Sequence, residues 1–275
     1  MRVHPLNLNR LLLVGLCVLL MHCRFLVNLF SFFPDRHDVP PPDRLPPGVQ
    51  ERFIGTADGE RLQCYWIPRP GSRYLLIYFH GNAGNIGHRL PDLRILADMH
   101  LNVLGVGYRG YGRSTGRPSE AGIYADGQAA LAHAGRELGF GPERVIVFGR
   151  SIGSSVAVRT AMDETLAAVI LVSPMTSGKA VGRQGGFGPL AFLAGDAFDN
   201  LSRIGRIRSP LLIVHGTADE VIPFAMGREL YDAAPQPKTF APVRGAGHND
   251  LGTAAAGAYW EAVAGFLSFL STSST

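Results

Sequence analysis

The sequence predicts an α/β fold in which an N-terminal antiparallel hairpin leads into a mostly parallel central sheet with helices on both faces. Short apolar runs alternate with helix-compatible segments along most of the chain, which is the pattern of a parallel sheet. Residues 74–79, YLLIYF, are continuously apolar, as expected for a strand covered on both faces. The length of 275 residues, with 46% hydrophobic and 17% charged residues, allows one large domain with a full core.

The elements follow in order from about residue 48. Residues 49–54 and 61–67 flank a turn at Asp58 and Gly59, which predicts the hairpin. The later strands are expected at 74–79, 102–107, 144–148, 168–172, 211–215 and 239–243, and the helices at 87–99, 123–138, 152–162, 224–233 and 253–270.

The least regular part of the predicted domain is the segment of about residues 176–209, between the strands expected at 168–172 and 211–215. Folds of this class insert lid elements at this point, so we expect a short lid; the alternative is a pair of ordinary surface helices. Its apolar side chains favour an acyl-binding wall, although core packing explains them equally well: they are Phe187, Leu190, Phe192, Leu193 and Phe198. Phe187 and Phe192 are the predicted substrate contacts in this segment.

Residues 1–33 are expected to form an N-terminal membrane anchor or signal segment. The stretch 11–33, LLLVGLCVLLMHCRFLVNLFSFF, is long enough to cross a bilayer of about 30 Å, and no small-residue cleavage site follows its first apolar part. We therefore expect an uncleaved, single-pass signal anchor, and a weak charge bias places the folded domain on the non-cytoplasmic side. A cleaved signal or lipoprotein start and an interfacial helix are the alternatives.

The next segment, residues 34–47, has the sequence PDRHDVPPPDRLPP. Proline cannot continue a helix, so this segment is expected to form a stiff linker. The predicted catalytic domain then spans residues 48–272, with the lid inside it.

The composition argues against several function classes. The net charge is only +4 and the 26 Lys and Arg residues are scattered along the chain, so we expect no nucleic-acid partner. Two of the three cysteines lie in the N-terminal apolar stretch, which leaves too few for a disulfide framework or a cysteine-based zinc site. The nine histidines show no metal-binding spacing, so neither a metal nor another cofactor is expected. Nothing in the sequence fixes an oligomeric state.

The strongest functional signal is the run of residues 145–153, VIVFGRSIG. A GxSxG pattern between a β-branched run and a helix-compatible segment is typical of a nucleophile elbow, a sharp turn that exposes a serine hydroxyl. A serine hydroxyl is a weak nucleophile near neutral pH and needs a histidine to take its proton. Ser151 is therefore the predicted nucleophile.

The base and its acid partner are expected in the order Ser, Asp or Glu, His. His248 lies in the glycine-rich loop GAGHND between the last strand and the last helix, and it is the predicted base. Asp219 follows the strand LLIVH directly, where sheets of this kind bind ligands, and its carboxylate would orient the imidazole. Its alternative role is an ordinary helix cap, and the other carboxylates in the required interval are Glu220, Asp196 and Asp199.

The developing oxyanion needs two preorganised N–H donors. We expect them from the backbones of Ile152, just after the nucleophile, and Asn82, in the loop after residues 74–79. His80 and His215 are interpreted as strand-end histidines that brace their loops. Three further side chains either line the substrate pocket or fix their own loop: Tyr108, Arg109 and Tyr111. Of these, Tyr108 is the predicted substrate contact.

Five motifs together resemble one branch of the α/β-hydrolase superfamily, the Bem46 and ABHD13/ABHD17-like serine hydrolases. They are HGNAGN (80–85), YRGYGRSTGRPSE (108–120), GRSIGS (149–154), HGTADEVIP (215–223) and GAGHND (245–250). The resemblance implies a triad of Ser151, Asp219 and His248 and oxyanion donors at Asn82 and Ile152. It also implies that an anchored or lipid-modified N-terminus is familiar in the group, in which some members are acyl-protein thioesterases.

The sequence thus predicts a membrane-associated serine hydrolase that cleaves an ester or thioester of a small-molecule or lipid-like acyl substrate through an acyl-enzyme. An amide or peptide hydrolase on the same triad is the first alternative. A non-catalytic binding protein that retains the fold is the second.

Overall fold

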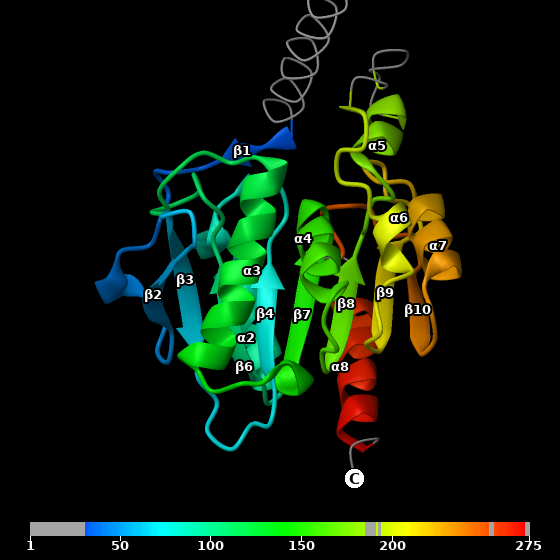
Figure 1. The fold of residues 1–275 in the computed structure, drawn as a ribbon. Coiled ribbons are helices and arrows are strands. Elements are labelled where there is room, and N and C mark those ends of the chain that lie inside the picture. Colours follow the sequence, from blue (N-terminus) through cyan, green and yellow to red (C-terminus); the bar gives the residue numbers. More distant parts are fainter. Residues whose placement is uncertain (1–30, 185–190, 192–193, 253–255, 273–275) are drawn as a thin grey trace, which may run out of the picture.

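The computed structural model describes residues 31–184, 191, 194–252 and 256–272, which form a central sheet flanked by helices (Figure 1). The described residues form an eight-stranded sheet in the order β10-β9-β8-β7-β4-β6-β3-β2, and a separate two-stranded sheet of β1 and β5. The strands are β1 (Phe33–Pro34), β2 (Gln50–Gly55), β3 (Arg61–Ile67), β4 (Leu75–Phe79), β5 (Ala83–Gly84), β6 (Asn102–Val106), β7 (Val145–Arg150), β8 (Ala168–Val172), β9 (Leu211–Gly216) and β10 (Lys238–Val243).

The helices lie on both faces of the large sheet (Figure 1). They are η1 (Pro42–Arg44), η2 (Ile86–Arg89), α2 (Leu90–Asp98), α3 (Glu120–Arg136), η3 (Pro142–Arg144), α4 (Ile152–Ala161), α5 (Gly178–Gln184), α6 (Leu201–Ile204), α7 (Phe224–Ala233) and α8 (Ala256–Thr272). Helix α3 begins three residues before the expected position because the Ser119 hydroxyl accepts a hydrogen bond from the Gly122 N–H at 3.1 Å and caps the helix.

The predicted hairpin is confirmed. β2 and β3 pair in antiparallel fashion with Ile54 opposite Leu62, and Gly59 in the connecting turn has φ +90°, a conformation that favours glycine. β3 is also antiparallel to β6, whereas the remaining neighbours in the large sheet are parallel.

Side-chain alternation along the central strands fills two cores. In β4, Leu75, Ile77 and Phe79 face the core beneath α3, α4 and α7, whereas Leu76 and Tyr78 face the core beneath α2 and α8. A strand buried on both faces needs apolar residues at every position, which explains the unbroken run YLLIYF. The predicted α/β class, with a hairpin followed by a mostly parallel sheet, is confirmed.

The segment expected to form a lid contains α5 and α6 within its described part. Phe198 is buried, and its ring makes an edge contact with Phe32 at 6.1 Å between centroids, so its role is core packing. Residues 185–190 and 192–193, which include Phe187 and Phe192, lie outside the described residues. The lid and these two substrate contacts stay predictions.

The expectation of a membrane anchor needs correction. Within the part of the chain that the structure describes, no helix combines the length and the apolar character required to cross a bilayer. This finding overturns the predicted single-pass signal anchor and the localisation built on it. Residues 1–30, which carry most of the apolar stretch, lie outside the described residues.

The first part of the proline-rich segment makes specific contacts with the domain, which the sequence did not predict. β1 pairs in parallel with β5, so Phe33 lies opposite Ala83 and Pro34 opposite Gly84. Asp35 continues this pairing, because its N–H donates to the Gly84 carbonyl at 2.9 Å. The segment expected to be a linker therefore begins as a partner of the loop that follows β4.

Candidate active site

The turn between β7 and α4 places Ser151 in a rare backbone conformation. Its φ and ψ are 54° and −123°, a region that costs a non-glycine residue about 1 to 3 kcal/mol and is often found at functional sites. The flanking glycines leave no room for a side chain. A Cβ on Gly149 would lie 2.4 Å from the Gly153 carbonyl oxygen, and one on Gly153 would lie 2.2 Å from that of Phe79. The GxSxG spacing is therefore a steric requirement of this turn.

His248 lies against the serine. Its Nε2 is 3.0 Å from Ser151 Oγ, within hydrogen-bond reach. The loop that carries it, between β10 and α8, is held at the His248 backbone. The N–H donates to Glu220 Oε2 at 3.1 Å, and the carbonyl accepts from Arg150 Nη2 at 3.1 Å. The imidazole is thus aimed at the serine by contacts from β7 and from the loop after β9.

Asp219 completes the chain of hydrogen bonds. Its Oδ2 accepts from His248 Nδ1 at 2.8 Å, and its Oδ1 accepts from the Val221 and Ile222 N–H groups at 3.0 and 2.7 Å. Glu220, the adjacent alternative, contacts the His248 backbone and not the imidazole. The structure therefore brings Ser151, His248 and Asp219 together in the order expected from the sequence.

The electrostatics of Asp219 favour its charged form. Burial raises the pKa of this carboxyl, but opposing contacts outweigh burial and hold the pKa well below its usual range. These contacts are hydrogen bonds from His215 and His248, the charge of His248 and a hydrogen bond from the Ile222 N–H. His215 Nε2 lies 3.4 Å from Asp219 Oδ2 and donates to the Ile222 carbonyl at 2.8 Å. Because a carbonyl only accepts, this nitrogen carries the proton. Asp219 is therefore a fixed, ionised acceptor.

The loop after β4 passes directly beside the serine. A Cβ built on Gly81 would lie 3.6 Å from Ser151 Cβ. The next residue, Asn82, accepts from the Tyr111 hydroxyl at 2.7 Å through its carbonyl and from the Phe33 N–H at 3.1 Å through Oδ1, and neither contact uses its own N–H. Ile152 is the first residue of α4, so its N–H has no acceptor within the helix.

His80 and Tyr108 support this loop. His80 Nδ1 donates to the Gly81 carbonyl at 2.6 Å, and burial lowers the pKa of the imidazole to about 3, so it is neutral. The buried Tyr108 hydroxyl donates to the His80 carbonyl at 2.9 Å, and the two rings lie 4.4 Å apart. These contacts favour loop bracing for both residues over proton transfer by His80 or a pocket-lining position for Tyr108.

A buried ion pair fixes the glycine-rich loop that carries Tyr108. Arg109 donates to Asp126 through its backbone N–H and through Nε, each at 2.8 Å, and its Nη1 and Nη2 donate to Asp58 at 2.7 and 3.0 Å. The Arg109 and Asp126 side chains are 8% and 0% exposed, whereas Asp58 is 53% exposed. No pattern in the sequence predicted this buried ion pair.

Because of this burial, Asp126→Asn is expected to lower the free energy of unfolding by about 3 kcal/mol, since the buried Arg109 charge would face a neutral amide and keep only the exposed carboxylate of Asp58 as a charged partner. Urea denaturation measures the loss. The matched control is Asp58→Asn, which removes an exposed partner of the same guanidinium and is expected to cost at most about 1 kcal/mol. Equal losses in the two variants would contradict the importance of burial.

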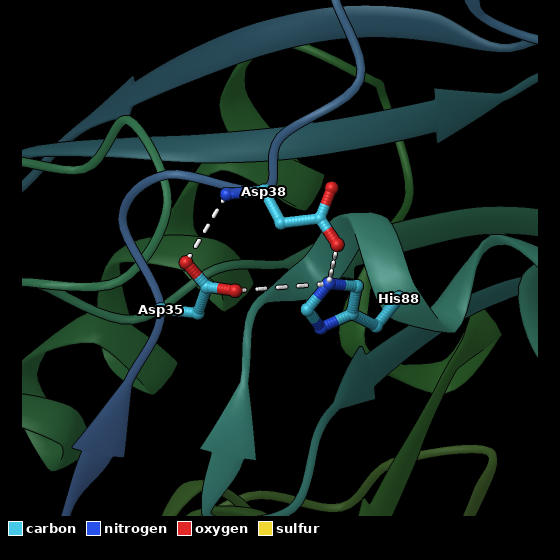
Figure 2. A group of neighbouring side chains, drawn as sticks. All are labelled: Asp35, Asp38 and His88. Carbon is cyan, nitrogen blue, oxygen red and sulfur yellow. Dashed lines mark hydrogen bonds and ion pairs between the residues drawn. The ribbon is translucent and has the colours of Figure 1, made fainter.

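The described residues contain one group of three potential metal ligands, Asp35, Asp38 and His88 (Figure 2). Their donor atoms lie within 4.8 Å of one another, and His88 Nε2 is 3.0 Å from Asp38 Oδ2 and 3.9 Å from Asp35 Oδ2. The side chains are half-buried or exposed and pair with one another. Their clear structural effect is to join the segment after β1 to η2.

The chain shares extensive sequence with proteins named for the α/β-hydrolase domain. It is 39% identical over 198 residues to human α/β hydrolase domain-containing protein 17B, covering 71% of this chain and 68% of that protein. It is 38% identical over 205 residues to Caenorhabditis elegans α/β hydrolase domain-containing protein aho-3, covering 74% of this chain and 61% of that protein. No family model matches the chain.

Solved structures show the same fold at lower identity. An esterase from Pyrococcus furiosus aligns with a TM-score of 0.73 at 21% identity, covering 86% of this chain and 97% of the esterase. An α/β hydrolase from Vibrio vulnificus aligns with a TM-score of 0.67 at 21% identity, covering 80% of this chain and 81% of that protein.

Proposed function

From the premise that this chain belongs to the α/β-hydrolase domain-containing protein 17 family of hydrolases, we propose that it is a serine hydrolase of carboxylic esters or thioesters. The observation that carries the proposal is the continuous hydrogen-bonded chain from Ser151 through His248 to Asp219. The substrate is a small molecule with an acyl or lipid-like group. The segment 176–209 is proposed to select that group.

In the proposed mechanism, Ser151 Oγ attacks the carbonyl carbon while His248 Nε2 takes its proton. Asp219 holds the other imidazole proton on Nδ1 and stabilises the imidazolium. The proton then passes from Nε2 to the departing alcohol or thiol, which leaves an acyl group on Ser151. Water attacks this acyl-enzyme with His248 again as the base and releases the acid.

The negative charge on the carbonyl oxygen needs donors that are already in position. Ile152 and Asn82 are proposed to donate their backbone N–H groups, each worth about 3 to 4 kcal/mol of transition-state stabilisation. Support comes from the free helical end at Ile152 and from the two contacts that hold Asn82 without engaging its N–H.

Labelling with a fluorophosphonate probe followed by peptide mass spectrometry tests the proposal. We expect one adduct, on Ser151, because only this serine hydroxyl has a histidine base paired to a carboxylate among the described residues. A protein that is folded by circular dichroism yet takes up no probe, or carries it on another residue, would overturn the proposal.

The type of bond is tested with matched substrates that carry one acyl group as a p-nitrophenyl ester, a thioester and an aminoacyl amide. Esters or thioesters are expected to turn over faster than amides, since their leaving groups depart more easily. Faster amide turnover would instead favour an amide or peptide hydrolase on the same three residues.

A further inference from the structure

We propose that residues 33–38, here called the N-terminal strap, position the backbone N–H of Asn82 and thereby complete the oxyanion hole. This inference rests on the proposed function, because the Asn82 N–H matters to catalysis only if Ser151 attacks a carbonyl. It assigns a positioning role to a segment with the composition of a linker.

The strap contacts the loop at Asn82 and at the two residues that follow. The Phe33 N–H donates to Asn82 Oδ1 at 3.1 Å, and β1 then pairs with β5 at Ala83 and Gly84. β5 has only two residues, and a strand this short is not stable without a partner. Among the described residues, β1 is the only strand paired with it.

The direction of the Asn82 N–H depends on constraints from outside the loop. This N–H shares a peptide plane with the Gly81 carbonyl, and glycine rotates more freely than other residues. His80 Nδ1 holds the Gly81 carbonyl at 2.6 Å, and the Tyr111 hydroxyl holds the Asn82 carbonyl at 2.7 Å. The Phe33 N–H holds the remaining polar group, the Asn82 side chain. Loss of the strap would remove one of three restraints and leave a flexible glycine next to the donor.

The strap is itself anchored well enough to act as a restraint. Its Asp35 carbonyl accepts from the Gly112 N–H at 2.9 Å, and its Asp38 carbonyl accepts from Asn85 Nδ2 at 2.7 Å. His88 Nε2 contacts Asp38 Oδ2 at 3.0 Å (Figure 2). Asp35 Oδ1 accepts from the His37 and Asp38 N–H groups at 2.8 and 3.1 Å, which closes the strap into a tight turn. Contacts from residues 85–88 and from Gly112, with the turn inside the strap, thus fix its position.

Two substitutions in the full-length chain break the same contact from its two ends. Phe33→Pro removes the N–H donor, and Asn82→Ala removes the side-chain acceptor while keeping the Asn82 N–H. The matched control is Phe33→Ala, which keeps the N–H and removes a ring that is 57% exposed. Ester hydrolysis gives kcat and KM for each variant, and circular dichroism and thermal melting report the fold.

Phe33→Pro and Asn82→Ala are each expected to lower kcat roughly 10- to 100-fold with KM changed less than about threefold, since a displaced oxyanion donor costs less than the 10²- to 10³-fold of a missing one. Phe33→Ala should stay within about threefold of wild type. The double variant should be no slower than the slower single variant, because Phe33→Pro already removes the hydrogen bond that Asn82→Ala breaks.

The inference fails if Phe33→Pro behaves like Phe33→Ala, if KM rises while kcat is unchanged, or if the two single effects multiply in the double variant. If Phe33→Pro does not fold, Asn82→Ala decides alone, and an unchanged kcat there overturns the role of the strap. Ser151→Ala distinguishes a failure of the proposed function from a failure of the proposed role of the strap. Full activity in that variant would defeat the proposed function, whereas a dead Ser151→Ala beside an unaffected Phe33→Pro would defeat only the strap.

Discussion

Replacing Ser151 with alanine is expected to lower kcat for ester hydrolysis roughly 10⁵- to 10⁶-fold, because the proposed acyl-enzyme route depends on this hydroxyl as its nucleophile. The fold should be retained, since the main structural bond of this residue, from its N–H to the Val172 carbonyl at 2.9 Å, uses backbone atoms alone. Steady-state hydrolysis of a p-nitrophenyl ester gives the rate, and thermal melting reports the fold.

A serine elsewhere on the surface supplies the control. Ser202 is exposed and its hydroxyl donates to the Asp199 carbonyl at 3.3 Å, so Ser202→Ala should keep kcat within about twofold of wild type. A Ser151→Ala protein that retained more than about a hundredth of the wild-type rate would contradict a nucleophilic role for Ser151.

Asp219→Asn is expected to lower kcat about 10⁴-fold with little change in the fold. The structure gives the reason at the level of single atoms. Oδ1 of this residue accepts two backbone N–H groups, so an asparagine would keep its oxygen there and turn its NH₂ toward His248 Nδ1. That arrangement forces the imidazole proton onto Nε2. A protonated Nε2 can no longer accept the proton of Ser151.

Glu220→Gln is the matched control, since Glu220 is the neighbouring carboxylate and contacts the His248 backbone through Oε2. A glutamine oxygen can still accept that bond, so the rate should fall less than about tenfold, the effect of one neutral hydrogen bond of about 1 kcal/mol. If Glu220→Gln lost as much activity as Asp219→Asn, the assignment of the acid would be wrong. The same kinetic assay compares both variants.

The arrangement of Ser151, His248 and Asp219 could be anticipated because each residue lies at a point that the backbone defines. The serine lies in a turn where only glycine fits at positions 149 and 153. The carboxylate comes directly after a buried strand, and the histidine lies in a glycine-rich loop. Parallel strands bring their carboxyl ends to one edge of the sheet, so local patterns far apart in the chain converge there.

The strap could not be anticipated, because its contacts are made largely by backbone atoms. The Phe33 N–H and the Asp35 carbonyl carry no side-chain signature, and the prolines around them favour an extended linker as readily as an edge strand. The buried pair of Arg109 and Asp126 was missed for a related reason. Charged residues are usually exposed, and only the packed structure shows which ones are enclosed.

The position of β10 at one edge of the sheet has a consequence for how activity is lost. His248 lies just beyond this outermost strand, whereas Ser151 follows β7 in the middle of the sheet. Peripheral elements open at lower free energy than central ones. Mild heat or denaturant should therefore detach His248, the proposed base, while Ser151 stays in its turn, and the proposed hydrolysis should cease before the chain as a whole melts.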